Sequence, residues 1–430
     1  MKSKETISRR SFLQGATAST LYLALGAPAV QKAALGADAA AAPAGAPITC
    51  GVIGTGPQGR ALLTALSRQP AAAVKAMCDI YPATLNGAKH YAPTAATLDD
   101  PARMLDDKSI QAVFIATPSH QHRQLVEAAI QAGKHVYCEA PLAITIEEAQ
   151  AIARAGKAAK TVFQVGLQQR YNPTYKHALK FVEMGALGDV AQARAQWHKK
   201  DSWRRMASTR EREHAINWRL YNETSPGLAG EVGIHQFDVI SWALRKLPVS
   251  VQGFGGIQHW NRTEENQTDD RNVADTMQCV LEYPGGVRIS YDATLANSLD
   301  GMYHLLMGAD SSILLREEKG WMVKEPGAPD FGWEVYAHKD KVGDQLGISL
   351  VADASKQLAA GKTELEQSNN NGKDALYYSV EGFLQSISDP AQKPASGAEE
   401  GLQATVVALK VNEAITSGKQ VTFQKEWFTL

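Results

Sequence analysis

From Ile48 onward, short runs of apolar residues alternate with longer segments whose apolar residues recur at helical spacing. The pattern predicts four strands, at residues 48–53, 73–78, 111–116 and 134–138. It also predicts a helix over 58–68 and, between the last two strands, a helix with Ser119 as its N-cap. A third helix opens with the capping box Thr145-Ile-Glu-Glu148. Strands and helices that alternate at this spacing indicate an α/β domain, with a parallel sheet wound with helices.

The pattern changes after about Tyr171. Alternating apolar and polar positions predict four further strands, at residues 190–198, 249–258, 276–283 and 287–295. Pro284-Gly285-Gly286 joins the last two strands as a hairpin turn. This half is expected to be an α+β domain with a large, mostly antiparallel open sheet. The helical segment 401–414 is a candidate to return to the first domain. We therefore expect a leader over 1–46, a first domain over 47–170 and a second over 171–430.

The segment before Ile48 carries the pattern of an export signal. Residues 8–13 read Ser-Arg-Arg-Ser-Phe-Leu, a twin-arginine pattern, and the apolar stretch 16–29 that follows is too short for a stable membrane span. Small-residue cleavage options and an Ala/Gly/Pro linker come next, up to Pro47. We expect the twin-arginine machinery to export the protein to the periplasm. An anchor that is never cleaved is the alternative.

The glycine motif after the first strand is the strongest chemical signal. The run Gly54, Thr55, Gly56, Pro57, Gln58 and Gly59 follows a predicted strand and opens a predicted helix, as a dinucleotide-binding fingerprint requires. Pyrophosphate would meet the free N–H groups at the helix N-terminus. Asp79 closes the second strand, where a carboxylate can accept the ribose 2′-OH and repels a 2′-phosphate. The sequence predicts a Rossmann domain that binds NAD in preference to NADP; a glycine turn that binds nothing is the alternative.

Composition adds mainly exclusions. The 430 residues carry a formal net charge of −1 without a basic stripe, which gives no reason to expect a nucleic-acid partner. The four cysteines, Cys50, Cys78, Cys138 and Cys279, show no CxxC spacing, so we expect small buried side chains rather than a disulfide or metal site. His120 and His122 have no third ligand at suitable spacing, and we expect no metal.

Several later motifs resemble one enzyme family. They are ATPSHQH at 116–122, GKHVYCEAPL at 133–142, GLQQRYNP at 166–173, GALGDV at 185–190, EVGIHQFD at 231–238 and NEAITSGKQV at 412–421. Together they closely resemble the glucose–fructose oxidoreductase/inositol dehydrogenase/MocA (Gfo/Idh/MocA) family. The resemblance implies a Rossmann domain plus an open-sheet domain, a homo-oligomer and a saccharide or polyol substrate. It also implies five further cofactor-site residues: Thr117, Pro118, His122, Glu139 and Arg170.

One position departs from the family pattern. The usual Glu-Lys-Pro is here Glu139-Ala140-Pro141. In relatives that lysine lies beside the nicotinamide and assists proton movement at the reacting hydroxyl. Alanine can neither carry a proton nor attract an alkoxide, so ordinary dehydrogenase chemistry needs another group here.

The remaining candidates come from residues 231–242 and from Tyr171. At 3.6 residues per turn, His235, Asp238 and Trp242 fall on one stripe of a predicted helix, with an aliphatic stripe opposite. The resemblance places His235 in the substrate cleft as the acid/base; Asp238 would orient it or bind a substrate hydroxyl. Glu231, where relatives commonly have Asp, and Trp242 are candidate substrate contacts. Tyr171 is either a second proton carrier or a packing residue.

Export and cofactor together limit the function. Free NAD cannot be relied on outside the cytoplasm, so an exported enzyme must return its bound cofactor to its starting state at each turnover. We expect an NAD-dependent oxidoreductase that acts on a sugar hydroxyl with a retained cofactor. The alternative is a redox-neutral glycoside hydrolase or lyase that works through a 3-keto intermediate. A second alternative is a non-catalytic sugar-binding protein.

Overall fold

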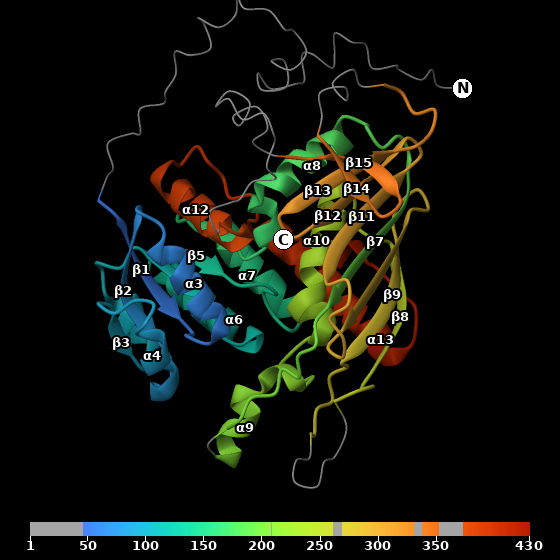
Figure 1. The fold of residues 1–430 in the computed structure, drawn as a ribbon. Coiled ribbons are helices and arrows are strands. Elements are labelled where there is room, and N and C mark those ends of the chain that lie inside the picture. The colour runs from blue at the N-terminus through green and yellow to red at the C-terminus, as the bar shows by residue number, and fades with distance from the viewer. Residues whose placement is uncertain (1–45, 208, 261–268, 331–337, 352–372) are drawn as a thin grey trace, which may run out of the picture. The chain divides into compact units, whose positions relative to one another are not determined.

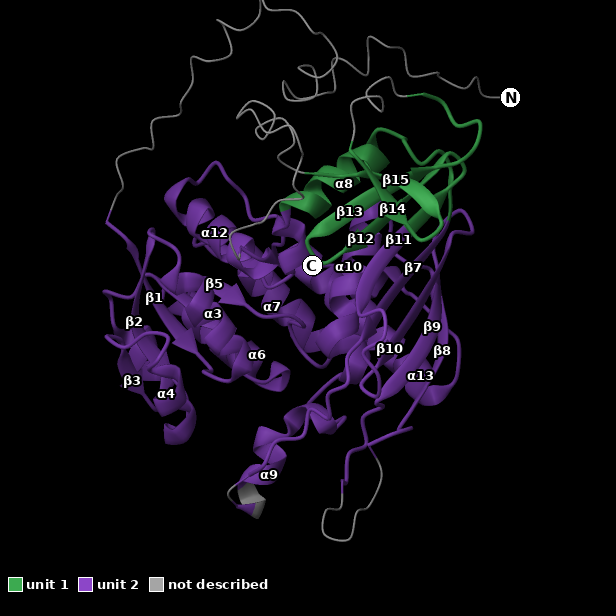
Figure 2. Ribbon diagram, in the orientation of Figure 1, with its two compact units in different colours: residues 1–45, 173–191, 306–372 green, residues 46–172, 192–305, 373–430 purple. Residues whose placement is uncertain are grey.

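The computed structural model describes residues 46–207, 209–260, 269–330, 338–351 and 373–430. The twin-arginine pattern and the linker up to residue 45 lie outside the described residues. Within those ranges no helix is both long enough and apolar enough to cross a membrane. The chain divides into two compact units (Figure 2). The larger holds residues 46–172, 192–305 and 373–430, and the smaller holds 173–191 and the described part of 306–372.

The larger unit begins with a parallel sheet whose strand order is β3-β2-β1-β4-β5-β6. Its strands are β1 Ile48–Ile53, β2 Ala72–Cys78, β3 Ala96–Leu98, β4 Ala112–Ile115, β5 His135–Cys138 and β6 Phe163–Val165. These bounds match the four predicted strands to within two residues. Strands β1 and β4 are almost wholly buried, as expected where helices cover both faces of a sheet.

Helices cover both faces of this sheet. They are α3 Pro57–Ser67, α4 Pro82–Ala88, α5 Pro101–Asp106, α6 His122–Gln131, α7 Ile146–Ala158 and, from the far end of the chain, α12 Ala375–Ser388. Helices α3 and α12 pack together (Figure 1). Phe383 of α12 contacts the rings of Phe114 and Tyr137 in the sheet. The predicted Thr145 cap is present, because its side chain accepts a hydrogen bond from the Glu148 N–H.

The predicted Ser119 cap is wrong. A 3₁₀ turn, η2 (Ser119–Gln121), precedes α6, whose N-cap residue is Gln121. The Ser119 hydroxyl instead donates to Glu231 Oε1 at 3.3 Å, a partner 112 residues away.

A second sheet in the larger unit follows the order β7-β10-β9-β8-β16. Its strands are β7 Val190–His198, β8 Ser250–Gly256, β9 Thr276–Glu282, β10 Arg288–Thr294 and β16 Val421–Thr422. Only the β7–β10 pair in this order is parallel. The predicted hairpin is present, with Gly285 and Gly286 at positive φ between β9 and β10.

Two helices cover this second sheet, α10 Ile234–Leu244 and α13 Ala398–Ser417. Phe237 of α10 packs edge-on against Tyr291 of β10. Helix α13 contacts β8 and α10 and also packs on α7 of the first sheet. The N–H of Leu142, beyond β5, donates to the Thr405 hydroxyl of α13 at 3.1 Å. The C-terminal helix therefore contacts elements of both sheets.

The segment between β7 and α10 becomes important below. It contains α9 Arg210–Ile216, the 3₁₀ turn η4 Trp218–Leu220 and a π-helical turn, η5 Ala229–Gly233, that runs directly into α10. We call residues 201–219 the arm.

The smaller unit holds α8 Pro173–Glu183 and an antiparallel sheet of order β14-β15-β13-β12. Its strands are β12 Ser311–Arg316, β13 Lys319–Lys324, β14 Lys339–Val342 and β15 Gln345–Ser349. Strand β11 Met302–Gly308 carries the chain from the larger unit into it.

Candidate active site

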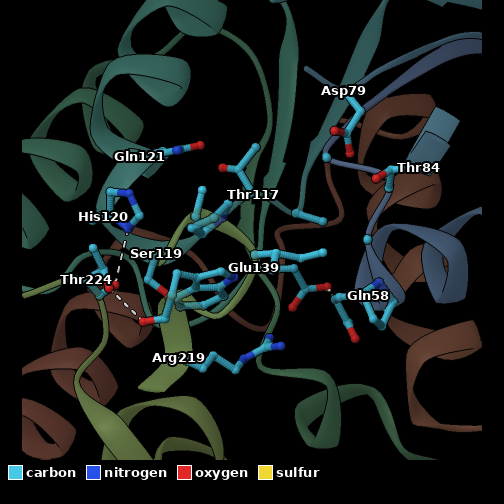
Figure 3. A pocket seen from close by; sticks show the side chains of 18 of the residues that line it. Gln58, Asp79, Thr84, Thr117, Ser119, His120, Gln121, Glu139, Arg219 and Thr224 are labelled. Atoms are coloured by element: carbon cyan, nitrogen blue, oxygen red, sulfur yellow. Dashed lines mark hydrogen bonds between the residues drawn. The ribbon is translucent and has the colours of Figure 1, made fainter. Parts of the chain in front are cut away.

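A cavity of about 1270 Å³ opens in the larger unit at the carboxyl ends of the parallel strands (Figure 3). One wall follows β1, β2, β4 and β5, where doubly wound sheets bind their ligands. The other wall comes from the arm, the π-turn and the first turn of α10. We call these the cofactor wall and the substrate wall.

The glycine turn on the cofactor wall leaves room for a ligand. Gly54 has φ +87°, and a Cβ there would lie 2.6 Å from the carbonyl oxygen of Ala116. A Cβ on Gly59 would overlap the carbonyl oxygen of Gly54. A Cβ on Gly56, by contrast, has no atom within 4 Å. Gly54 and Gly59 thus shape the turn, whereas Gly56 keeps open the space in front of the α3 N-terminus, where no side chain caps the helix.

Asp79 fits a ribose at the end of β2. Its Oδ2 accepts hydrogen bonds from the Thr55 N–H at 2.9 Å and the Thr55 hydroxyl at 3.0 Å, and its Oδ1 accepts from the Tyr81 N–H. Oδ1 keeps a lone pair for a ligand hydroxyl. The buried Thr117 hydroxyl on the same wall has no hydrogen-bond partner among the described residues. An open helix N-terminus, a held carboxylate and an orphaned hydroxyl together fit a dinucleotide.

Glu139 marks the far end of the cofactor wall, beside Ala140. The Gln58 amide donates to Glu139 Oε1 at 2.9 Å (Figure 3). Burial raises the pKa of Glu139 to about 7, and the Gln58 hydrogen bond and the positive charge of Arg219 partly offset that rise. This carboxyl group therefore titrates near neutral pH.

Glu231 holds the two walls together. Its Oε1 accepts from Ser119 and from Ser225 at 3.0 Å, and its Oε2 accepts from Arg219 Nε at 3.0 Å. The Arg219 guanidinium lies over the Trp218 ring, 4.6 Å from its centroid. The predicted substrate contact thus lines the cavity, but in this structure it binds protein groups.

His235 lines the same cavity from the first turn of α10. Burial lowers the pKa of His235 to about 4, so its imidazole is neutral at pH 7. Its buried Nδ1 has no hydrogen-bond partner within the described part of the chain. A neutral imidazole that lines the cavity can accept a proton from a bound hydroxyl.

Comparisons with known proteins identify this architecture. A family model described as an oxidoreductase family with an NAD-binding Rossmann fold matches residues 48–167, and the Gfo/Idh/MocA C-terminal domain model matches 175–313. The chain belongs to the Gfo/Idh/MocA family. Its N-terminal domain is an NAD-binding Rossmann domain, and the chain is an NAD-dependent oxidoreductase-family enzyme, as the motifs predicted.

The relatives are distant. Inositol 2-dehydrogenase of Rhizobium meliloti is 25% identical over 280 residues, which cover 65% of this chain and 76% of the relative. Levoglucosan dehydrogenase of Pseudarthrobacter phenanthrenivorans is 33% identical over 137 residues, 32% of this chain and 33% of the relative. A solved levoglucosan dehydrogenase in complex with NADH and L-sorbose has a TM-score of 0.71 at 20% identity, over 88% of this chain and 99% of that one. This structural similarity supports the fold.

Within this Gfo/Idh/MocA protein, most of the predicted cofactor residues line the cavity: Gly54, Gly56, Pro57, Gln58, Asp79, Thr117, Pro118, His122 and Glu139. Thr55 and Gly59 support this wall without lining the cavity. Thr55 donates hydrogen bonds to Asp79, and Gly59 allows the glycine turn to close. Both nitrogens of His122 face backbone carbonyls, of Pro141 at 2.9 Å and Thr117 at 3.0 Å. His122 therefore connects two loops of this wall.

Asp238, Arg170 and Trp242 form a separate cluster outside the cavity lining. The Asp238 carboxylate receives three hydrogen bonds of 2.8–3.0 Å from Nε and one terminal nitrogen of Arg170. The same guanidinium lies 5.5 Å from the Trp242 ring centroid. Burial raises the pKa of Asp238 and the arginine opposes that rise. The structure therefore does not support contact of Arg170 with the cofactor, of Asp238 with His235 or of Trp242 with substrate.

Tyr171 takes the packing role that the sequence left open. Its hydroxyl accepts hydrogen bonds from the N–H of Ser396 at 3.3 Å and its hydroxyl at 3.4 Å, and its ring packs against Gly382. Burial raises the pKa of Tyr171 to about 12. The residue is outside the cavity lining, so this geometry gives no support to a second proton carrier here.

The four thiols are all buried, as expected of small core side chains. Among the residues that the structure describes, no cluster of three or more His, Cys, Asp or Glu side chains could hold a metal ion.

The sequence interpretation missed the arm. Trp203, Arg205 and Arg212 line the cavity, and the 4.1 Å distance from the Arg212 guanidinium to the Tyr81 ring centroid joins the arm to the cofactor wall. The available signal was an unusual density of arginines in the stretch SWRRMASTREREHAINWR at 202–219, between a strand and a helix.

Proposed function

We propose that this protein oxidises a hydroxyl group of a sugar or sugar derivative with an NAD that stays bound through successive turnovers. The observation that carries the proposal is the neutral His235 imidazole in the cavity that also contains the dinucleotide turn. Family membership and the inositol 2-dehydrogenase relative support a polyhydroxylated substrate.

The chemistry divides between cofactor and protein. NAD, held by the glycine turn, Asp79 and Thr117, supplies the hydride acceptor when bound. The His235 imidazole accepts the hydroxyl proton, because its low pKa keeps the ring neutral at neutral pH. The Arg219 guanidinium adds a positive charge to the cavity, and this charge can stabilise a developing alkoxide. Ala140, which stands in place of the family lysine, has no charge to do so.

The retained cofactor follows from the proposed export. A twin-arginine signal carries folded proteins, so the Rossmann domain can load NAD in the cytoplasm. The periplasm offers no dependable supply for exchange. A second sugar that is reduced by the same cofactor would complete the cycle.

A redox-neutral glycoside hydrolase or lyase is the second candidate, and the Glu139 carboxyl group favours it. This reaction needs a base for the C2 proton of a 3-keto intermediate and an acid for the leaving group. A carboxyl group with a pKa of about 7 can serve in either role, and it shares the cavity with His235. The cycle leaves the cofactor unchanged overall, which also suits an exported protein.

The test begins with mature protein purified without added nucleotide. Denaturation should release close to one NAD per chain. Native protein is then incubated with free sugars and aryl glycosides, without NAD, and absorbance at 340 nm is followed. A single reduction of bound NAD that stalls until a second sugar arrives supports the oxidoreductase. Repeated aglycone release without net reduction favours the hydrolase. Failure of every saccharide to reduce bound NAD or to turn over contradicts both and indicates a binding protein.

A further inference from the structure

Four arginines line the cavity, one of which is Arg212, and five carboxyl groups line it with them: Asp79, Glu139, Glu223, Glu231 and Asp270. Arg60 comes from the first turn of α3, Arg205 from the arm and Arg219 from η4. Arg219 is paired with Glu231, and both of its terminal nitrogens remain without hydrogen bonds to the described residues. The side chains of Arg60 and Arg205 have neither an ion pair nor a hydrogen bond in the described part of the structure. Two guanidinium groups of the cavity lining, those of Arg60 and Arg205, are therefore available to a ligand.

Arg205 is held in place by its backbone. The buried Asn217 amide accepts from the Arg205 N–H at 2.7 Å and donates to its carbonyl oxygen at 3.1 Å. The preceding Arg204 is paired with Glu213 and with Asp269 at 3.2 Å. These contacts fix the main chain on both sides of Arg205, while its guanidinium is left exposed.

The three charges lie close enough to affect one another. Partial desolvation, and then the positive charges of Arg219 and Arg60, lower the pKa of Arg205. Asp201, whose Oδ1 accepts from the Trp203 N–H, partly opposes this lowering. Other carboxylates of the cavity have protein partners: Glu231 binds Arg219, Asp270 binds Arg204 and Tyr221, and Asp79 binds main-chain groups. Like charges in a partly desolvated cavity repel one another, and an anion that binds between them removes that cost.

We propose that Arg60 and Arg205 bind the pyrophosphate of NAD, so that the arm fastens the cofactor in the cavity and slows its release. This inference rests on the retained cofactor of the proposed function and assigns the retention to specific residues. The glycine turn alone offers main-chain N–H groups, whereas guanidinium groups add charge-assisted and bidentate contacts to phosphate oxygens.

The position of these residues favours the cofactor over an anionic substrate. Arg60 is four residues after Gly56, in the helix whose N-terminus faces the pyrophosphate position. At the other end of the arm, Arg212 lies over Tyr81, two residues beyond the ribose-binding Asp79. The positive charges of Arg60 and Arg219 both act on Arg205, and all three residues line the same cavity as the glycine turn.

The experiment measures cofactor retention and needs no turnover. Full-length protein and the variants Arg205→Gln, Arg205→Lys and Arg60→Gln are purified without nucleotide, and bound NAD is quantified. Its dissociation is followed by a chase with labelled NAD at 50 mM and 500 mM NaCl. Arg154→Gln on α7 is the matched control, because it removes an exposed arginine outside the cavity.

Loss of one phosphate contact predicts about 10- to 100-fold faster NAD release in Arg205→Gln, with a smaller salt dependence than in the parent protein. NAD release from Arg205→Lys should be faster than from the parent protein and slower than from Arg205→Gln. Lysine keeps the positive charge but lacks the planar guanidinium that can bind two phosphate oxygens. After bound nucleotide has been removed with charcoal, Arg205→Gln should bind ADP-ribose more weakly than the parent protein and bind adenosine equally well. Arg60→Gln should repeat these effects, while Arg154→Gln should match the parent protein.

Two results would overturn the inference. One is NAD release from Arg205→Gln and Arg60→Gln at the parent rate. The other is normal NAD release together with a raised KM for acidic sugars only, which would assign the arginines to an anionic substrate. If none of the sugars reduces the bound NAD, but both variants still release NAD faster than the parent protein, the proposed function is refuted and this inference stands.

Discussion

On the cofactor wall of the cavity the main chain makes the site, whereas on the substrate wall side chains from distant segments make it. Gly54, Gly56 and Gly59 lie within a stretch of six residues, and their effect is exerted through backbone space. Glu231 binds Arg219 and Ser225 of its own segment and Ser119 of the cofactor wall, 112 residues away. The first kind of site can be recognised in a short sequence window. The second depends on which segments meet after folding.

Burial shifts the pKa values of ionisable groups on the two walls in opposite directions. Burial raises the pKa of the Glu139 carboxyl on the cofactor wall and lowers the pKa of the His235 imidazole on the substrate wall. Both shifts favour the uncharged form, as desolvation requires. A protonated carboxyl group and a neutral imidazole provide an acid and a base in one cavity at neutral pH.

The largest expected effect separates His235 from Asp238 on the same helix. His235→Gln should lower kcat by about 10²- to 10⁴-fold, because it removes the proposed base, and should leave the melting temperature and NAD content close to those of the parent. Asp238→Asn should lower the free energy of unfolding by about 3 kcal/mol, because it leaves Arg170 buried without its charge partner. Steady-state kinetics and thermal melts on both variants check this.

The Asp238→Asn variant also serves as the control for His235→Gln. Its kcat per folded molecule should remain within about threefold of the parent, since Asp238 is outside the cavity lining. A kcat loss in Asp238→Asn as large as that in His235→Gln, without loss of stability, would restore Asp238 to the catalytic machinery.

A second comparison divides the cofactor wall itself. Gly56→Ala places a methyl group in open space, so the fold should keep its melting temperature while NAD affinity falls by about 100-fold. Gly59→Ala forces a methyl group against the Gly54 carbonyl, so the melting temperature should fall as well. NAD content and thermal melts on nucleotide-free protein distinguish the two. Equal NAD binding by Gly56→Ala and the parent would move the pyrophosphate away from this turn.

Local signals were enough to predict the central strands of both sheets of the larger unit, whereas strands β3, β6 and β11 to β16 were not predicted. Strands β1, β2, β4 and β5 and the β9–β10 hairpin are bounded by glycines, prolines and changes of period that a short window contains. Ser119 shows the limit of such windows. Its residue type suits an N-cap, but the hydroxyl binds Glu231, and only the folded chain brings that carboxylate within reach.

The candidate site, too, could be predicted only in part from the sequence. The glycine turn and Asp79 followed from spacing, and His235 followed from the family motif. Helical periodicity correctly placed Asp238 and Trp242 on one stripe of α10, but it could not show that Arg170 covers that stripe. The arm was missed because its function depends on Asn217 holding the Arg205 backbone and on Arg212 reaching Tyr81.

The smallest expected effect tests the opposite pKa shifts through stability. The unfolded chain protonates His235 near its usual pKa of 6.5, whereas the native protein resists protonation down to about 4, so stability is lost as the pH falls between these values. Glu139 works in the other direction: the native protein holds its proton up to about 7 and the unfolded chain releases it near 4.5, so stability is lost as the pH rises through this window. Each group should contribute a slope of about 1 kcal/mol per pH unit.

Urea unfolding from pH 4.5 to 8 measures these contributions. The free energy of unfolding should fall less toward acid pH in His235→Gln, and less toward pH 8 in Glu139→Gln, than in the parent protein. His304, whose pKa burial lowers to about 3, retains part of the acid loss in both variants. Parallel pH profiles for the parent and both variants would mean that neither group is shifted.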